Sequence, residues 1–192
     1  SLQFILRQIA GQTLERLAAD AACVFLKQDD GIQIAAVDNL PSKLIETRVS
    51  PDGIAGQVIR TGQPVQLENY ERSWQQEHDI PFAAETFGSV ICVPLIYAEA
   101  TIGALMAISG KRKRAFQADD ALLLGMLGAQ AAVAIQHGQL FKQQRILNDE
   151  IASARNQLET LLTSTENPVI AVDRQLHMIF ANNAAERLFP DL

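Results

Sequence analysis

Apolar residues recur every three or four positions through residues 1–19. They are Leu2, Ile5, Leu6, Ile9, Leu14 and Leu17. This spacing predicts an amphipathic helix with one apolar face. Two apolar runs follow at 22–27 and 32–37, and the Asp29-Asp30-Gly31 turn between them predicts a β-hairpin.

Residues 50–62 carry start and stop signals for a short helix. Ser50 can cap it, Pro51 suits its first position, and Gly62 can end it. A brief strand is predicted at 65–67. Residues 69–85 follow no period and mix polar with aromatic side chains, which is typical of a functional loop.

A second hairpin and a long helix are predicted in the next part of the chain. The apolar runs 88–96 and 101–108 predict the hairpin, with its turn at Glu99 and Ala100. Pro94 predicts a bulge or an edge position in the first of these strands. The helix is predicted to begin near residue 119, where carboxylates suit a helix N-terminus, and to continue to about residue 164.

The long helix carries an apolar seam with a period of seven residues. Setting Met126 as heptad position d places the other d and a positions without a slip. The apolar seam residues are Val133, Leu140, Leu147, Ile151, Ala154, Leu158 and Leu161. This seam predicts a coiled-coil helix pair, parallel or antiparallel, and a homodimer through the N- and C-terminal helices. The polar a position Gln144 weakens the pairing, and the alternative is a helix that packs only within its own chain.

The chain changes character after Pro168. Strands are predicted at 169–173 and 176–180, and a helix from about Asn182. About 30 residues cannot bury a core of their own, so we expect the tail to begin a further domain. The predicted domains are a sensor domain at 1–136, a signalling helix at 137–164 and an N-terminal domain fragment at 165–192.

Composition and charge narrow the classes of function. The chain is 48% hydrophobic and 20% charged, as soluble globular proteins are. A net charge of −6 argues against a nucleic-acid partner, which would require a basic surface. There is no uninterrupted apolar run of about 18 residues and no signal-peptide pattern, so we expect a cytoplasmic segment without membrane contact. Cys23 and Cys92 are expected to be buried thiols because both lie in apolar runs. A disulfide between them is possible only if their strands are adjacent.

No catalytic or metal-binding pattern is present in the sequence. It has no Gly-rich phosphate loop ending in Gly-Lys-Ser/Thr, no His-Glu-x-x-His and no Gly-x-Ser-x-Gly. His137 precedes Gly138 and not the acidic residue that follows a kinase phosphoacceptor histidine. We therefore expect no catalytic residues, no metal site and no enzyme activity in this segment.

The order of predicted elements in residues 1–137 resembles the GAF domain family. The segments that carry the resemblance are 53–58, 62–65, 89–95 and 102–105, with Phe116 ahead of the acidic start of the long helix. The resemblance implies an α/β (α+β) fold with an antiparallel sheet of five to six strands flanked by helices. Residues 167–189 are similar to the opening of a PAS domain, including its Asn182-x-Ala184 step.

A GAF-like domain, a signalling helix and a PAS-like start in series resemble bacterial sensor histidine kinases, diguanylate cyclases and other cyclic-di-GMP-type regulators. The resemblance implies a small cytoplasmic molecule as the input, but the sequence identifies no cofactor. Cyclic-nucleotide binding is disfavoured because Gly110 and Ala121 stand where that pattern has Asn and Glu. A covalent bilin is disfavoured because both cysteines lie in predicted strands. Haem would depend on His78, and a lone loop histidine is more often solvated.

The candidate ligand site combines the glycine-bracketed helix with the aromatic loop. Gly53 and Gly56 would let the helix N-terminus approach a neighbouring strand and offer backbone donors to a ligand's negative group. The other candidate residues are Tyr70, Trp74, His78, Phe82 and Ser89. Two hypotheses remain: a ligand-sensing domain that relays a signal through paired helices, and a ligand-free dimerisation module with a filled pocket.

Overall fold

The computed structural model describes residues 2–111, 113 and 115–189. The chain forms two compact units, Ser1–Leu140 and Phe141–Leu192, and the long helix α5 (Ala118–Ser164) contributes to both. Positions 190–192, at the end of the expected tail fragment, lie outside the described residues.

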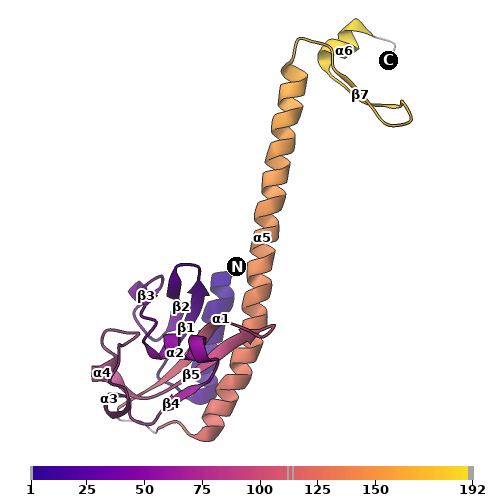
Figure 1. Cartoon of the computed structure of the whole chain (residues 1–192). Coiled ribbons are helices and arrows are strands. Elements are labelled where there is room, and N and C mark those ends of the chain that lie inside the picture. Colours follow the sequence, from indigo (N-terminus) through magenta and orange to yellow (C-terminus); the bar gives the residue numbers. More distant parts are fainter. Residues whose placement is uncertain (1, 112, 114, 190–192) are drawn as a thin grey trace. The chain divides into compact units, whose positions relative to one another are not determined.

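A six-stranded antiparallel sheet forms the centre of the first unit, as Figure 1 shows. Its strand order is β3-β2-β1-β6-β5-β4. The strands are β1 (Ala21–Gln28), β2 (Gly31–Asp38), β3 (Arg48–Val49), β4 (Val65–Leu67), β5 (Phe87–Tyr97) and β6 (Ala100–Gly110). The predicted α/β (α+β) fold with five to six antiparallel strands and flanking helices is therefore confirmed.

The central strand β1 is buried on both faces of the sheet. Its side chains alternate between two hydrophobic cores because successive residues of a strand point in opposite directions. Cys23 and Phe25 belong to one core, and Ala22, Val24 and Leu26 belong to the other. This double burial explains why the strand is an almost continuous apolar run in the sequence.

Two helices cover one face of the sheet, which we call the helical face. Helix α1 (Leu2–Leu17) buries Leu6 and Leu17 there, and the first part of α5 buries Leu124 and Ile135. The two helices also pack on each other, since a Cβ placed on Gly138 would touch the side chains of Leu2 and Ile5. Figure 1 shows α1 beside the first part of α5.

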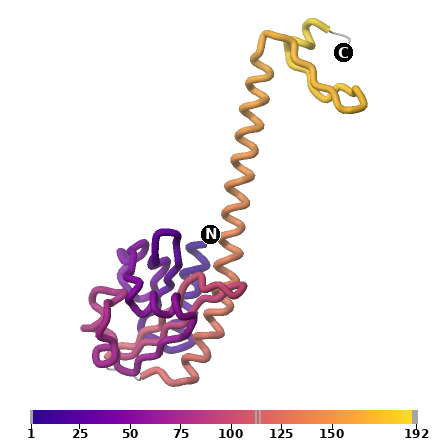
Figure 2. The backbone as a smooth tube through the Cα atoms, in the orientation of Figure 1, coloured from indigo at the N-terminus to yellow at the C-terminus, as the bar shows by residue number. Residues whose placement is uncertain are grey.

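Short helices and loops cover the opposite face, which we call the cavity face. They are the 3₁₀ turn Ser42–Leu44 and the helices α2 (Ile54–Thr61), α3 (Tyr70–Ser73) and α4 (Ala83–Thr86). In Figure 2 the backbone of this layer is an irregular path of loops, in contrast to the long helical turns of the other face. Gly62 ends α2 in the left-handed conformation at φ 66°, and its N–H bonds Val58 O, as predicted.

Helix α2 begins three residues later than the Ser50 cap predicts, at Ile54 and not at Pro51. The Ser50 hydroxyl instead accepts a hydrogen bond from Asp52 N at 3.2 Å, and Gly53 N donates to Ser50 O at 3.2 Å. Residues 50–53 therefore form a turn, and Gly53 is the N-cap. The Ser50-Pro51 pair therefore marks a turn of the chain, and the prediction that the helix starts there was wrong.

Other differences from the predicted elements are small. Strand β3 and the 3₁₀ turn were not predicted, and the unperiodic segment 69–85 contains α3 and α4. The turn of the second hairpin lies one residue earlier than predicted, because Ala98 and Glu99 adopt positive φ angles of 46° and 68°. Pro94 lies beyond the end of the β4 pairing, at an edge of the sheet, as predicted.

The two cysteines are free and fully buried. Cys23 on β1 and Cys92 on β5 both lie opposite Met106 of β6, the strand that separates them. Their strands are therefore not adjacent, whereas a disulfide would have required adjacent strands. Burial raises the pKa of both thiols well above the ordinary value, and the nearby Asp79 carboxylate adds to it.

The second unit contains the remainder of α5, a two-stranded hairpin and a short helix. The hairpin consists of β7 (Ile170–Val172) and β8 (Met178–Ala181), and helix α6 is Asn183–Leu188. Along α5 in this unit, the seam residues Leu147, Ile151 and Leu158 are 56%, 59% and 61% exposed.

Helix α5 also contains an 18-residue window with a mean hydropathy of 1.4, enough for a membrane span by length and composition. Buried helices of soluble proteins pass the same test, and α5 buries Leu124, Ala131, Ala132 and Ile135 on the sheet.

Candidate functional site

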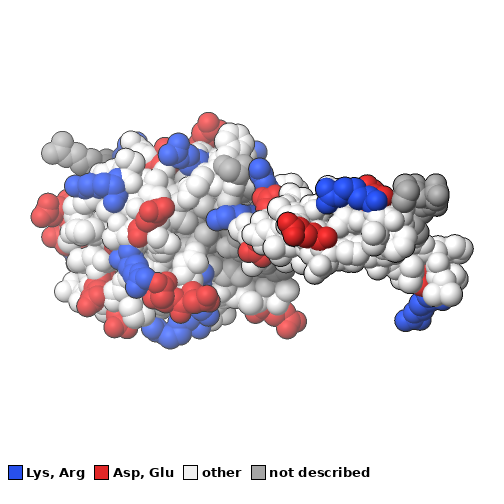
Figure 3. Space-filling model, turned by 90° about the horizontal axis from the view of Figure 1, so that it is seen from above, with Lys and Arg blue, Asp and Glu red and all other residues white. Residues whose placement is uncertain are grey.

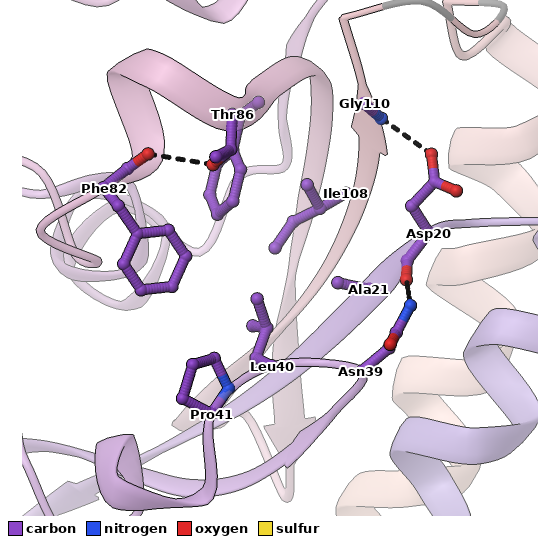
Figure 4. A pocket seen from close by; sticks show the side chains of 10 residues that line it. Asp20, Ala21, Asn39, Leu40, Pro41, Phe82, Thr86, Ile108 and Gly110 are labelled. Carbon is purple, nitrogen blue, oxygen red and sulfur yellow. Dashed lines mark hydrogen bonds between the residues drawn. The ribbon is translucent and has the colours of Figure 1, made fainter.

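The cavity face contains a cavity of about 440 Å³ at one end of the sheet. It lies where the starts of β1 and β5 meet the end of β6, beneath α4 and the chain after β2. Its lining residues are Asp20, Ala21, Asn39, Leu40, Pro41, Phe82, Thr86, Phe87, Ile108 and Gly110. Figure 4 shows the Phe82 ring facing Leu40 and Pro41, with Asp20 and Asn39 on the other side. The volume is within the range of small-molecule sites.

One end of this cavity is polar. The Asp20 carboxylate accepts hydrogen bonds from Gly110 N at 2.8 Å and from Lys113 Nζ at 2.5 Å. Burial raises the pKa of Asp20, but these two hydrogen bonds and the lysine charge together hold it below the ordinary value. The Asn39 side chain donates to Asp20 O, which fixes the chain after β2 against the start of β1.

An aromatic cluster forms the wall between the cavity and α3. The rings of Phe82 and Phe87 meet edge to face at 6.4 Å, and those of Tyr70 and Phe87 at 5.5 Å. The Tyr70 hydroxyl hydrogen-bonds His78 Nδ1 at 2.7 Å. The structure thus links three predicted site residues: Tyr70 and Phe82 both contact Phe87, and His78 contacts Tyr70. Only Phe82 of these three lines the cavity.

The N-terminus of α2 is occupied by a carboxylate of the same chain. Asp79 is 6% exposed, and its Oδ2 accepts a hydrogen bond from Ala55 N at 3.1 Å. Its Oδ1 has no hydrogen-bond partner within the described residues. Burial raises the pKa of Asp79 to about 6, and the amides of Ala55 and Ile54 offset part of that effect. The place predicted for a ligand's negative group is filled from within.

The two glycines of α2 serve packing contacts that the sequence did not indicate. A Cβ on Gly53 would collide with the Asp79 carboxylate, and a Cβ on Gly56 would collide with the backbone of Pro51. The expected close approach to a neighbouring strand is therefore not their role. Gly53 instead leaves room for the Asp79 side chain, and Gly56 leaves room for the backbone of the preceding turn.

The last two predicted site residues are buried and hydrogen-bonded. Trp74 is 7% exposed, and its Nε1 donates to Glu77 O at 2.9 Å. The Ser89 hydroxyl accepts a hydrogen bond from Phe116 N at 3.2 Å. Ser89 also borders a separate polar hollow of about 240 Å³ beside Glu71 and Lys111.

Sequence reasoning missed Asp20, Asn39, Asp79 and Phe87. Asp20 and Asn39 are separated along the chain by the first hairpin, and no local pattern joins its two ends. Asp79 lies inside the polar–aromatic segment that the sequence indicated as functional. Nothing in the sequence indicated that it would bond the N-terminus of α2. Phe87 belongs to the apolar run of β5 and gave no separate signal.

An antiparallel sheet with a helical pair on one face and a loop-covered cavity on the other defines a small α/β domain with a cavity of ligand size. The family model described as a GAF domain matches residues 1–136. The chain belongs to the GAF domain family, a family of ligand-binding regulatory modules that are generally not catalytic. No curated protein matches the chain.

Solved GAF domains share this fold. The second GAF domain of DevS from Mycobacterium smegmatis is 23% identical with a TM-score of 0.61, over 76% of this chain and 99% of that one. The GAF domain of a phosphoenolpyruvate-protein phosphotransferase from Coxiella burnetii is 21% identical with a TM-score of 0.65, over 74% and 87%. At these identities the likeness concerns the fold alone.

A third similar structure is named as an enzyme. The type II free methionine-R-sulfoxide reductase from Thermoplasma acidophilum is 16% identical with a TM-score of 0.59, over 71% of this chain and 96% of that one. The thiols of Cys23 and Cys92 are 0% exposed. Their burial and raised pKa values disfavour a nucleophilic role for either one in this chain.

Proposed function

We propose that this chain is a cytoplasmic sensory module of a signal-transduction protein. In this proposal a small molecule binds in the cavity beside Phe82, and the first domain (1–136) passes the change to a signalling helix (137–164). That helix, paired with its copy in a homodimer, acts on a PAS-like domain that starts at 165–192 and on an output domain of the histidine kinase or cyclic-di-GMP type.

The observation that carries the proposal is that the same strands line the cavity on one face and support helices α1 and α5 on the other. Ala21 of β1 and Ile108 of β6 are paired, and both line the cavity. The next pair along the same two strands, Ala22 and Ala107, points into the core beneath α1 and α5. A ligand that prefers one arrangement of these strands would therefore favour one arrangement of the helices.

The cavity lining favours a small and largely apolar ligand with one polar end. The Phe82 and Phe87 rings, Leu40 and Pro41 offer apolar and stacking surface. At the other end, the Asp20 carboxylate accepts bonds from Gly110 N and Lys113 Nζ and keeps lone pairs for a hydrogen-bond donor on the ligand.

Homodimerisation is supported by an exposed apolar stripe on α5. Within the first unit Leu122, Met126, Val133 and Leu140 are 69%, 59%, 43% and 48% exposed. Residues 121–141 contain no Asp, Glu, Lys or Arg. A groove of about 620 Å³ runs beside Leu122 and Met126, and its other side includes Pro64, Val93, Pro94 and Ile96. A patch with both a ridge and a hollow supports the proposed pairing, because a two-fold interface places the same patch of both copies face to face.

The proposal includes no nucleic-acid partner. On the face of the first unit seen in Figure 3, acidic and basic side chains are interspersed and form no continuous basic surface. The net charge of −6 would oppose binding to a polyanion.

The second candidate function is a ligand-free dimerisation module. It is supported by the hydrogen bonds that the predicted site residues make within the chain: His78 with Tyr70, and Trp74 with a backbone carbonyl. In addition, Asp79 occupies the α2 N-terminus. In this candidate the cavity would hold only water.

A ligand screen with a cavity-blocking variant tests the first candidate. The unfolding temperature of the chain would be measured with indole, aromatic amino acids, oxo-acids, cyclic nucleotides and haem. A ligand at about one hundred times its Kd stabilises the folded state by about 2.7 kcal/mol. Leu40→Trp should abolish that shift by filling the cavity. Gln63→Trp should preserve it, because Gln63 is exposed and does not line the cavity. No stabilisation by any compound favours the ligand-free module.

The dimer is tested separately by sedimentation. Replacing both Leu147 and Leu158 with Lys places charges in the proposed seam and should convert a dimer into a monomer. Replacing both Ala152 and Asn156 with Lys should leave the dimer intact, because these two residues are exposed on the same helix outside the seam. A wild-type chain that sediments as a monomer at high concentration contradicts the coiled coil.

A further inference from the structure

Asn182 is the most extensively bonded side chain of the second unit. It lies between β8 and α6 and is 0% exposed. Its side-chain Oδ1 accepts hydrogen bonds from Val169 N at 2.9 Å and from Ala185 N at 2.9 Å. The first bond holds the approach to β7, and the second caps the N-terminus of α6. These two bonds alone would account for a local folding role.

The amide nitrogen of Asn182 points to a different set of partners. Nδ2 donates to the carbonyl oxygens of Leu162 at 3.0 Å, Thr165 at 3.3 Å and Asn167 at 2.9 Å. Leu162 belongs to the last turn of α5, and the other two belong to the segment that joins α5 to β7. One side chain therefore contacts the end of α5, the connection, the hairpin and α6.

The contact with Leu162 completes the end of α5. The last four carbonyl groups of a helix have no partner within the helix. At this end the Thr165 hydroxyl bonds Leu161 O at 2.7 Å, but Leu162 O is bonded from 20 residues further along the chain. Helix α5 also ends at Ser164 without a glycine to close it. The next module of the chain thus supplies part of the cap of this helix.

We propose that Asn182 is a positioning residue that couples the last turn of α5 to the β7–β8 hairpin and α6. The inference rests on the proposed relay through α5 and adds where the relay enters the following domain. Apart from Asn182, the chain passes from Ser164 to Ile170 without helix or strand, and such a segment transmits rotation or translation poorly. With Asn182 in place, a displacement of Leu162 O moves the side chain that orients both Val169 and α6.

A local capping role and a coupling role use different atoms of Asn182, so they can be separated. Capping of α6 requires only the acceptor Oδ1, whereas coupling to α5 requires the donors on Nδ2. Asn182→Asp keeps acceptors and loses every donor. Asn182→Ser keeps a good helix cap, but its hydroxyl is too short to reach α5. The neighbouring exposed Asn183 allows a control of identical chemistry, Asn183→Asp.

The experiment uses the 192-residue chain with spin labels at Gln157→Cys and Arg187→Cys. Both positions are exposed, and the two native cysteines are buried and escape labelling. We expect a narrow distribution of label distances in the parent chain and in Asn183→Asp. In Asn182→Asp and Asn182→Ser the distribution should broaden, and amide exchange at residues 162–164, in the last turn of α5, should rise on the order of tenfold or more. The exchange protection of the β7–β8 hairpin should be retained in Asn182→Ser.

Two results would overturn the inference. A distribution as narrow as the parent's in both Asn182 variants would show that the donors do not hold α5 to the hairpin. Loss of hairpin protection in both variants would assign Asn182 to the folding of the hairpin and not to coupling. Neither result depends on a ligand or on dimerisation, so the outcome is independent of the thermal-shift and sedimentation tests.

Discussion

The two faces of the sheet differ in how their buried polar groups are satisfied. The core of the helical face consists of aliphatic side chains with Phe116, and the buried Thr13 on α1 bonds Ile9 O within its own helix. The core of the cavity face includes Tyr70, Trp74 and two thiols, and Asp79 borders it with a carboxylate oxygen that has no partner among the described residues.

This difference indicates where each face can respond. Close-packed aliphatic cores tolerate little rearrangement, because any gap loses contacts. The cavity face has empty volume, and its buried carboxylate is stabilised by few partners, so a ligand or proton can alter it at lower cost. The helical face is therefore suited to transmit a displacement and the cavity face to receive one.

The largest expected effect tests the rigidity of the helical face. Leu124→Ala removes a fully buried side chain from the α5–sheet contact and should lower the free energy of unfolding by about 3 kcal/mol. Lys142→Ala, at an exposed position of the same helix outside the seam, should change it by less than about 0.5 kcal/mol. Urea unfolding of both variants checks the contrast. Equal effects would mean that α5 does not pack on the sheet through Leu124.

The second prediction concerns the pH dependence of the cavity face. The pKa of Asp79 is about 6 in the folded chain, against an ordinary value of 3.8 for aspartate, so the folded state binds more protons between these values. Stability due to this group should therefore fall as the pH rises from about 4 to 6 and stay low above that. The shift corresponds to about 3 kcal/mol at 1.36 kcal/mol for each pH unit.

Asp79→Asn removes this titration. Above pH 6 the variant should be more stable than the parent by about 1–3 kcal/mol, because the amide avoids the buried charge but leaves a donor without a partner. Asp52→Asn, at an exposed position before α2, should be neutral. The measurement is the difference in unfolding free energy between parent and variant from pH 4 to 8. A difference that does not change with pH would contradict the raised pKa.

The helical face could be predicted from sequence more completely than the cavity face. Its helices bury residues at spacings of three and four, and that period is visible locally in α1 and at the start of α5. The strands were found for the same reason, since β1 and β5 are apolar runs between turn residues. Five of the six strands of the sheet and both of its hairpins follow from such local patterns, and only the two-residue strand β3 does not.

The cavity face depends on contacts between residues far apart in sequence. Asp79 reaches the α2 N-terminus from 24 residues away, and Asn39 reaches Asp20 O from 19 residues away. No period links such partners. The glycines at 53 and 56 were recognised as positions of close approach, but the sequence could not say that Asp79 and Pro51 are what approaches.

The smallest expected effect tests whether the aromatic wall is held by polar contacts or by packing. Tyr70→Phe removes the hydroxyl that bonds His78 Nδ1 at 2.7 Å and leaves the ring against Phe87. Because His78 is exposed and can bond water, the cost should be only about 1 kcal/mol. Tyr97→Phe is the matched control, since its hydroxyl makes no hydrogen bond within the described part of the chain, and it should be neutral. A loss near 3 kcal/mol for Tyr70→Phe, measured by urea unfolding, would show that the hydrogen bond and not ring packing orders this wall. The segment from Trp74 to Phe82 would then be the more rigid part of the cavity face, and the input would have to act elsewhere.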